Sequence, residues 1–248
     1  MKNKEYRVLL IVLVLLLFLV NYGFIDNFLK KTFFGEEFVV VERVIDGDTL
    51  VIDGNSMRLL GINTPEKGEF LYEEAKDFLE ELTFNKTLLV EKHGKDLYGR
   101  ELVYLFDKKK NLNIEIVKEG FANYYFPEGK DTRYNKFKRA WETCLRNNKN
   151  LCELSKEGCS GCIELKEFKK QLVILYNKCG FDCNLSGWSI KDQGRKKFVF
   201  EDFVLGSEKS TEITAEDFNE EYVWTETGDT LFLRDSKGKL VLWKKYGY

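Results

Sequence analysis

The sequence contains one histidine and two prolines, and its net charge is close to zero. The single histidine among 248 residues, His93, excludes any mechanism that needs two histidines. The net charge of −2 excludes an overall basic footprint, so a nucleic-acid ligand would require positive charge that is concentrated locally. No long-period repeat and no low-complexity tract is present. An apolar fraction of 44% is ample for packed cores, and the length favours two domains with attachments over one.

Long hydrophobic runs are also rare, and the N-terminus holds the one that stands apart. Residues 8–20 are thirteen unbroken apolar positions, and the run continues to residue 25. A helix over residues 8–25 would span roughly 27 Å, close to the hydrocarbon thickness of a bilayer. Basic residues precede the run, which places the N-terminus in the cytoplasm and the rest outside. We expect residues 1–26 to be a single-pass membrane anchor; a cleaved signal segment, the alternative, would make the protein secreted.

Cysteine is absent from the first 143 residues, and all six cysteines lie between Cys144 and Cys183. An even number of cysteines in an exported protein favours disulfides. The spacing Cys159-x2-Cys162 with Cys179-x3-Cys183 also fits a zinc ribbon, so zinc stays an alternative. Short-range pairs are the simplest disulfide arrangement, and a local Cys179–Cys183 bridge would fix a turn.

Residues 43–66, RVIDGDTLVIDGNSMRLLGINTPE, are the stretch around which the sequence is organised. Apolar, β-branched runs alternate with turn residues at positions 46–48 and 53–55, which predicts a three-stranded meander. Asp48 lies at one turn, and Asn63 and Thr64 end the third strand. The side-chain oxygens of Asp48 and Asn63 and the backbone carbonyl of Thr64 would form an open oxygen site suited to Ca²⁺.

Further charged residues complete a plausible hydrolytic centre. Glu66 follows the meander and is placed to accept a proton from water. Arg58, in the third strand, and Arg100, from a distant turn, are suited to hold a phosphate group through paired hydrogen bonds. A metal, a carboxylate base and two guanidinium groups are the components that phosphodiester hydrolysis requires.

The remaining pattern up to residue 154 completes a small mainly β domain. A helix, two strands and two further helices are expected after the meander, an order typical of an OB-fold barrel. The expected bounds are helix 68–83, strand 87–92, strand 100–106, helix 111–119 and helix 131–148.

Composition changes after residue 154, where a small, polar linker is expected at 155–162. Short strands separated by turns then predict a β-sandwich. The expected strands are 172–176, 187–191, 197–200, 221–224, 229–235 and 240–244. The segment 192–194 is interpreted as a turn between two of them.

The segments VIDGDT, RLLGINTPE and LYGR, in this order, resemble the staphylococcal nuclease (thermonuclease) family over about residues 38–154. The resemblance implies Ca²⁺-dependent endonucleolytic hydrolysis of DNA and RNA that leaves 3′-phosphates. By position, it implies the catalytic residues Arg58, Glu66 and Arg100, the metal ligands Asp48, Asn63 and Thr64 with Asp46 in support, and the substrate-binding residue Tyr98.

The sequence departs from the family pattern at two of these places. Asn63 stands where the best-known members have aspartate, and Leu97 stands where a lysine usually precedes the tyrosine. A neutral amide in place of a carboxylate predicts weaker Ca²⁺ binding or a changed metal preference. The departure at Leu97 removes one phosphate contact.

The C-terminal segments LSGWSIKD (185–192) and GDTLFLRDSKGKLV (228–241) resemble the lamin-tail domain, an immunoglobulin-like sandwich. The resemblance implies a binding or tethering module without catalytic residues, whose ligand the sequence leaves unknown. Trp188 and Trp224 are then expected in the core.

Together these features predict a mainly β protein with three parts: a membrane anchor or signal at 1–26, an OB-fold nuclease domain at 38–155, and a lamin-tail-like sandwich at 160–248. We expect a monomer that acts on DNA and RNA and is attached to the membrane through its N-terminal helix. The alternative is a non-catalytic cell-surface protein that binds nucleic acid without cutting it.

Overall fold

The computed structural model describes Tyr6 and residues 37–127, 129–169 and 171–247. The expected anchor at 1–26 lies outside these residues except for Tyr6. From Val39 onward the described residues form one compact unit, which contains the elements discussed below. Within the described ranges, no helix has both the length and the apolar character needed to cross a membrane.

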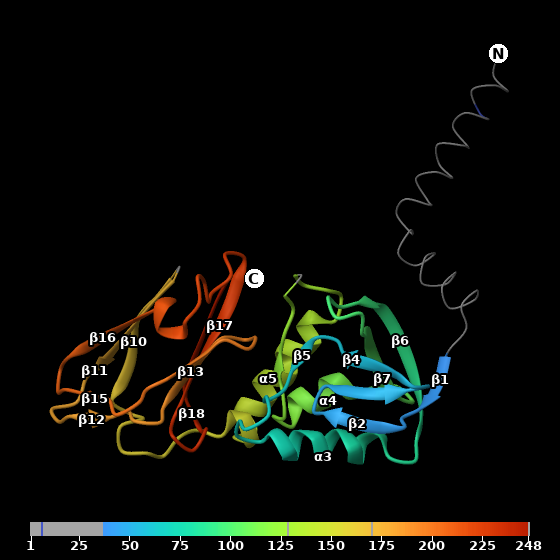
Figure 1. The fold of residues 1–248 in the computed structure, drawn as a ribbon, viewed down its shortest axis with the longest axis horizontal. Helices are drawn as coiled ribbons and strands as arrows, with labels where there is room; N and C mark the ends of the chain where they lie inside the picture. The colour runs from blue at the N-terminus through green and yellow to red at the C-terminus, as the bar shows by residue number, and fades with distance from the viewer. Residues whose placement is uncertain (1–5, 7–36, 128, 170, 248) are drawn as a thin grey trace. The chain divides into compact units, whose positions relative to one another are not determined.

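The N-terminal half of this unit is built on a curled, mainly antiparallel sheet (Figure 1). Its strand order is β1-β6-β7-β4-β3-β2, with β8 paired to β7. The strands are β1 (Glu37–Val40), β2 (Arg43–Asp46), β3 (Thr49–Ile52), β4 (Asn55–Leu59), β6 (Thr87–Lys95), β7 (Glu101–Asp107) and β8 (Lys110–Asn111). The predicted meander is confirmed as β2, β3 and β4. The parallel pairing of β4 with β7 sets Arg58 opposite Leu102 and so brings the Arg100 turn to the meander.

The third predicted strand is interrupted, because the chain turns at Gly61. Gly61 has φ +81°, and a Cβ atom there would lie 3.0 Å from the ring of Phe126 and 3.1 Å from that of Phe137. Glycine therefore meets both a left-handed backbone and a tight packing site. After the turn, β5 (Ile62–Asn63) pairs with β9 (Asn123–Tyr124), a short strand that was not predicted, and Asn63 lies opposite Asn123.

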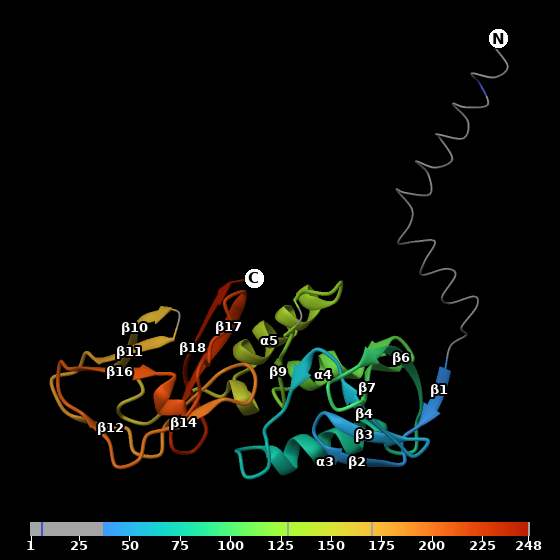
Figure 2. The ribbon, with the colours of Figure 1, turned by 45° about the horizontal axis from the view of Figure 1, so that its top comes forward.

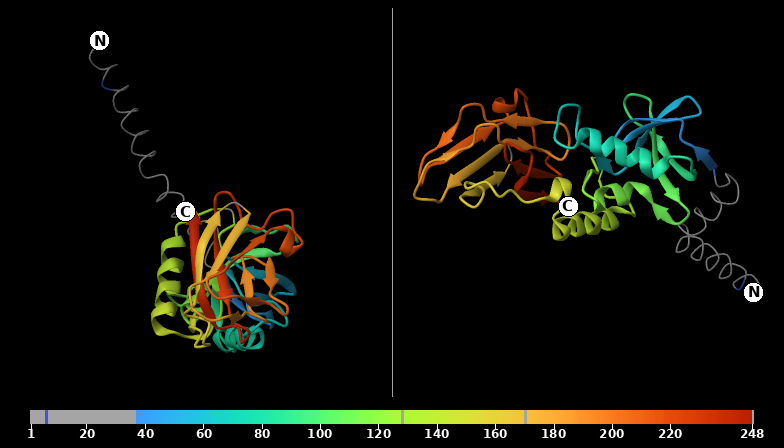
Figure 3. Two further views of the ribbon diagram at one scale, coloured as in Figure 1. Left: turned by 90° about the vertical axis from the view of Figure 1, so that its left-hand side faces the viewer. Right: turned by 90° about the horizontal axis from the view of Figure 1, so that it is seen from below.

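Three helices pack around this sheet: α3 (Tyr72–Thr83), α4 (Leu112–Lys118) and α5 (Tyr134–Asn147). Helix α3 buries Ala75, Leu79 and Thr83 and lies along β2 (Figures 1 and 3). It begins four residues after the predicted start, since residues 66–71 form turns. The N-terminus of α4 is capped by Asn111, whose side-chain oxygen accepts a hydrogen bond from the Ile114 N–H at 2.9 Å.

The C-terminal half is all β, as predicted, and also contains a short 3₁₀ turn (Figure 2). Three small sheets have the orders β10-β11-β16, β14-β13-β17-β18 and β12-β15. The strands are β10 (Ile163–Lys169), β11 (Leu172–Asn177), β12 (Cys183–Asn184), β13 (Ser189–Lys191), β14 (Lys197–Val199), β15 (Val204–Leu205), β16 (Ser210–Thr214), β17 (Gly228–Arg234) and β18 (Leu240–Gly247). The 3₁₀ turn of this half is Glu216–Phe218; another, Asn150–Cys152, follows α5 in the nuclease half.

One predicted strand of this half, 221–224, is wrong. The segment is irregular, because the side chain of Gln171 takes the place of a neighbouring strand. Its Oε1 accepts hydrogen bonds from the backbone N–H groups of Val223 at 2.7 Å and Trp224 at 3.3 Å. Trp188 and Trp224 are buried in the core, as expected.

All six cysteines form disulfides, which rules out the zinc alternative. The pairs are Cys144–Cys152, Cys159–Cys183 and Cys162–Cys179. The expected local Cys179–Cys183 bridge is wrong, because each of these cysteines bonds to one cysteine of the Cys159-x2-Cys162 turn. The linker at 155–162 is thereby fastened to the sandwich, and the Lys178 N–H donates to the Cys162 carbonyl at 2.9 Å.

The two halves share apolar packing. Trp141 of α5 contacts Phe232 of β17 and Trp243 of β18, with ring centroids 5.6 Å and 6.4 Å apart, respectively. Arg234, which is partly buried, donates from Nη1 to the Leu151 carbonyl at 2.8 Å. Burial lowers the pKa of Arg234 to about 10, and nearby Glu69 opposes that shift. The sandwich is therefore held against the first half by buried contacts.

Candidate active site

The turn between β2 and β3 presents the buried carboxylate of Asp48. A Cβ atom at Gly47 would lie 2.9 Å from the side chains of Ala75 and Thr64, so glycine lets this turn pack closely. One carboxylate oxygen of Asp48 accepts from the backbone N–H and the hydroxyl of Thr64, both at 3.2 Å. The other accepts from the Thr49 hydroxyl at 3.1 Å. The Asp48 N–H in turn donates to Asp46 Oδ1 at 3.0 Å, which joins the two acidic residues.

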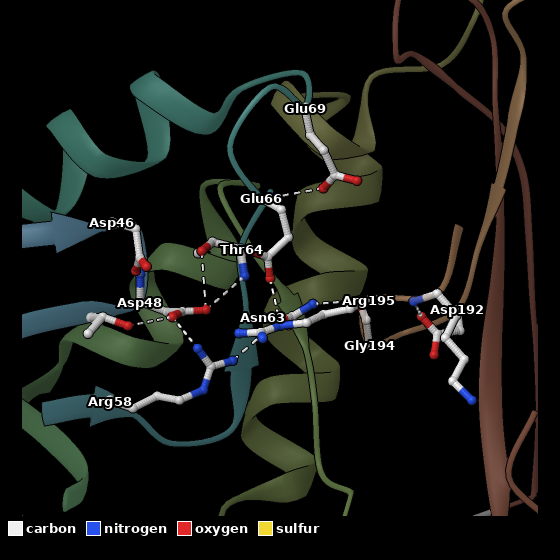
Figure 4. Close-up of polar contacts among 12 residues, drawn as sticks. Asp46, Asp48, Arg58, Asn63, Thr64, Glu66, Glu69, Asp192, Gly194 and Arg195 are labelled. Carbon is white, nitrogen blue, oxygen red and sulfur yellow. Dashed lines mark hydrogen bonds and ion pairs between the residues drawn. The ribbon is translucent and has the colours of Figure 1, made fainter. Parts of the chain in front are cut away.

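Arg58 links the meander to the end of β5 (Figure 4). Its partner across the β3–β4 ladder is Thr49, next to Asp48. One guanidinium nitrogen forms an ion pair with Asp48, and the other donates to Asn63 Oδ1 at 3.1 Å. The Arg58 and Asp48 side chains are 12% and 4% exposed, so the pair is largely shielded from water.

The oxygen atoms that were predicted to bind Ca²⁺ lie around the turn between β2 and β3, where Arg58 contacts two of the predicted ligands, Asp48 and Asn63. Burial raises the pKa of Asp48; Arg58 opposes the shift, and the negative charge of Asp46 adds to it. A divalent cation would favour the ionised form of this crowded carboxylate pair. Asp46, Asp48, the Asn63 amide oxygen and the Thr64 carbonyl are the groups that would hold it. The described residues contain no cluster of three or more histidine, cysteine or acidic side chains that could hold a metal ion.

The turn before β7 brings the second arginine to the same network. Arg100 donates from Nε to Asp96 Oδ2 at 2.7 Å and from Nη1 to the Thr49 hydroxyl at 3.4 Å. Because Thr49 also donates to Asp48, Arg100 is linked to that carboxylate through the Thr49 hydroxyl, whereas Arg58 contacts it directly. Tyr98 is exposed, and its ring centroid lies 5.5 Å from the Arg100 guanidinium carbon. Tyr98 is thus available to a ligand at this edge.

Glu66 lies just beyond the Thr64 backbone, at the entrance to the site (Figure 4). Its N–H donates to Glu69 Oε2 at 2.9 Å, which fixes the backbone after Pro65. Its side chain is 45% exposed, and Oε1 lies 2.8 Å from Nε of Arg195. The structure thus keeps the predicted base accessible to water and pairs it with a residue from the C-terminal half.

The turn that carries Arg195 is the part of the site that sequence reasoning missed. The Asn63 amide nitrogen donates to the Gly194 carbonyl at 2.7 Å and to the Gln193 carbonyl at 3.4 Å. The Asn123 amide donates to the same Gln193 carbonyl at 3.0 Å. Residues 192–194 were interpreted only as a turn, and no local signal connects them to a motif about 130 positions earlier.

This contact gives a physical role to the departure at Asn63. An amide has both a donor and an acceptor, so Asn63 bonds to the Gly194 carbonyl while its oxygen faces Arg58. An aspartate there would have an oxygen facing two carbonyl oxygens. Asn63, which lowers the negative charge of the predicted metal site, is therefore also the residue that holds the C-terminal turn.

We expect Asn63→Asp to tighten Ca²⁺ binding and to destabilise the protein at the same time. A third carboxylate strengthens the donor set, whereas the lost hydrogen bonds leave buried carbonyls unpaired at a cost of about 1 to 3 kcal/mol. Calcium titration by calorimetry and urea unfolding measure the two effects. Asn123→Asp is the matched control, since it also faces Gln193 but is not among the metal donors. Unchanged calcium affinity in Asn63→Asp would show that Asn63 is not a ligand.

Comparison with known proteins identifies two families along the chain. Residues 56–153 match the family described as Staphylococcal nuclease homologue, and residues 160–248 match the Lamin Tail Domain. A thermonuclease of Staphylococcus intermedius is 31% identical over 146 residues, covering 52% of this chain and 87% of that protein. A thermonuclease of Staphylococcus hyicus is 30% identical over 128 residues, covering 47% of this chain and 76% of that protein.

An uncharacterized endonuclease of Haemophilus influenzae is 35% identical over 99 residues. The match covers 38% of this chain and 56% of that protein, so the chain spans little more than half of that relative. The family match at residues 56–153 includes Arg58, Glu66 and Arg100. The chain therefore belongs to the staphylococcal nuclease family, with a Lamin Tail Domain after its nuclease domain.

Proposed function

We propose that this protein is a Ca²⁺-dependent endonuclease that hydrolyses DNA and RNA to products with 3′-phosphates. The observation that carries the proposal is that Arg58 contacts Asp48 directly and Arg100 is linked to it through Thr49, beside an accessible Glu66. Two guanidinium groups far apart in the sequence converge on one small acidic site, as binding of a phosphodiester requires. The thermonuclease relatives and the family match support the same reaction.

In this proposal each side chain has a defined task. Glu66 accepts a proton from the attacking water, whose oxygen forms a bond to phosphorus while the bond to the 5′-oxygen breaks, and the departing 5′-oxygen takes a proton from solvent. Arg58 and Arg100 bind the phosphate oxygens and stabilise the additional negative charge of the transition state. Tyr98 contacts the nucleotide at the exposed edge. When bound, Ca²⁺ supplies positive charge that offsets the charge developing on the phosphate.

We further propose that the protein acts outside the cytoplasm as a monomer. Three disulfides within 40 residues are typical of an oxidising compartment, which supports export. Attachment to the cell membrane through residues 1–26, or secretion after their cleavage, rests on the apolar N-terminal sequence. The ligand of the Lamin Tail Domain is not part of this proposal.

A nuclease assay of the full chain tests the proposed activity. We expect cleavage of plasmid and single-stranded DNA in Ca²⁺, loss of cleavage with chelator, and products that carry 3′-phosphates. Asn63 replaces a charged ligand with a neutral amide. We therefore expect cleavage to need about millimolar rather than micromolar Ca²⁺, as at the weaker calcium sites of proteins. Repeating the assay with other divalent metals tests whether the metal preference has changed. Binding without cleavage under every divalent metal would favour the alternative, a non-catalytic nucleic-acid-binding protein.

A further inference from the structure

We propose that residues 193–195, in the β13–β14 turn of the Lamin Tail Domain, are part of the nuclease active site, and that Arg195 binds a phosphate group of the substrate. The inference rests on the proposed nuclease function and gives the second domain a direct part in it. Figure 4 shows Gly194 and Arg195 among the predicted site residues, next to Asn63 and Glu66. No motif of the nuclease domain supplies this arginine.

Contacts with the nuclease domain hold the turn in place. Besides the amide hydrogen bonds from Asn63 and Asn123, Lys191 at the base of the turn forms an ion pair with Glu69 at 2.5 Å. The Lys191 and Glu69 side chains are only 15% and 18% exposed. Burial alone would raise the pKa of Glu69, but Lys191 and its neighbours hold it below its usual value, so the pair is charged. The turn is thus fixed to the site by polar contacts that water screens poorly.

Contacts inside the sandwich fix the shape of the turn. Asp192 Oδ1 accepts from the Lys196 N–H at 2.9 Å, which closes the turn across its base. The Gln193 N–H donates to Asp229 Oδ1 at 3.3 Å. Asp192 and Asp229 are both buried, and these bonds tie the turn to strand β17. Arg195 therefore extends from a rigid support, and little order has to be gained when a ligand binds.

Arg195 itself is available to a substrate. Its side chain is 54% exposed, and its contact is with the equally accessible Glu66. An exposed ion pair of this kind stabilises little, so the guanidinium can exchange Glu66 for an incoming phosphate, whose oxygens it binds in a paired fashion. Because the ion pair is weak, it does not hold Glu66 in an inactive state. Arg195 would then be a third guanidinium at the site, and Glu66 would be released to face water.

Arg195→Ala tests this assignment in the full chain. With labelled single-stranded DNA in Ca²⁺, we expect KM to rise on the order of tenfold, the effect of one lost charge-assisted hydrogen bond. The slope of log affinity against log salt should fall in magnitude by about 0.7, as expected for one phosphate contact. Arg195→Lys should recover part of the affinity, because it keeps the charge and loses the planar fork.

Lys196→Ala is the matched control. It removes the same charge from the adjacent residue, but Lys196 faces Glu220 and Tyr222. We expect its KM and salt slope to equal those of the wild type. Equal KM values for Arg195→Ala and Lys196→Ala would overturn the inference, and a higher kcat in Arg195→Ala would instead show that the turn blocks the site.

The failure of this inference can be distinguished from failure of the proposed function. If the wild type cuts no substrate in any metal, the nuclease proposal fails. Fluorescence anisotropy with the same DNA then decides the role of Arg195. Weaker binding by Arg195→Ala than by Lys196→Ala would uphold a phosphate contact, and equal binding would overturn it.

Discussion

Glu66→Gln is expected to lower kcat by about two to four orders of magnitude, the usual contribution of a general base. Glutamine has nearly the same shape but cannot take the proton of the attacking water. The side chain is about half exposed and its ion pair with Arg195 is accessible to solvent, so the fold should be unaffected. Single-turnover cleavage of labelled DNA in Ca²⁺ measures the effect, and urea unfolding checks the fold.

Glu73→Gln provides the control for this experiment. Glu73 is an exposed carboxylate in the first turn of α3, so its substitution removes the same charge away from the site. Its turnover should equal that of the wild type. Near-wild-type turnover in Glu66→Gln would mean that another group activates the water and would remove Glu66 from the mechanism.

Arg58→Ala is expected to lower the free energy of unfolding by about 3 to 5 kcal/mol, because it leaves a buried carboxylate without its charge partner. Asp48 is 4% exposed at its side chain, and Arg58 is its only charged donor in the described residues. The variant should also lose activity, since one phosphate-binding group is missing. Urea unfolding followed by circular dichroism measures the stability change.

The double variant Arg58→Ala/Asp48→Asn separates the lost pair from lost packing. Removing the carboxylate as well should recover part of the stability, because no buried charge then remains unpaired. Arg100→Ala should cost less stability, since its partner Asp96 keeps hydrogen bonds from two backbone N–H groups. If Arg58→Ala were as stable as the wild type, the ion pair between Arg58 and Asp48 would not contribute to the stability of the site.

The local sequence determined most of the nuclease half. Turn residues between short β-branched runs are sufficient to form β2, β3 and β4, because neighbouring strands pair through local turns. The register places Thr49 opposite Arg58, so Asp48 and Arg58 meet within one meander. Helical periodicity likewise indicated α3 and α5, although the start of α3 shifted because a carboxylate bond organises the residues after Pro65.

Predictions from the local sequence were wrong where a residue bonds to a group that is distant in the sequence. The backbone of Val223 and Trp224 has strand-like composition but bonds to the Gln171 side chain. Likewise, Cys179 and Cys183 do not bond to each other; they bond to Cys162 and Cys159, respectively. Spacing along the chain limits which pairs are possible, but the fold decides which sulfur atoms meet.

By itself, then, the sequence determined the chemistry available to this protein: the acidic turn, the base, the two arginines and the amide at position 63. The tertiary structure decided which of these meet, since the parallel β4–β7 pairing carries Arg100 to Thr49. It also decided that Asn63 bonds to Gly194 and that Arg195 reaches Glu66. Such contacts depend on the packing of one half against the other, and packing leaves no periodic or local pattern in either segment.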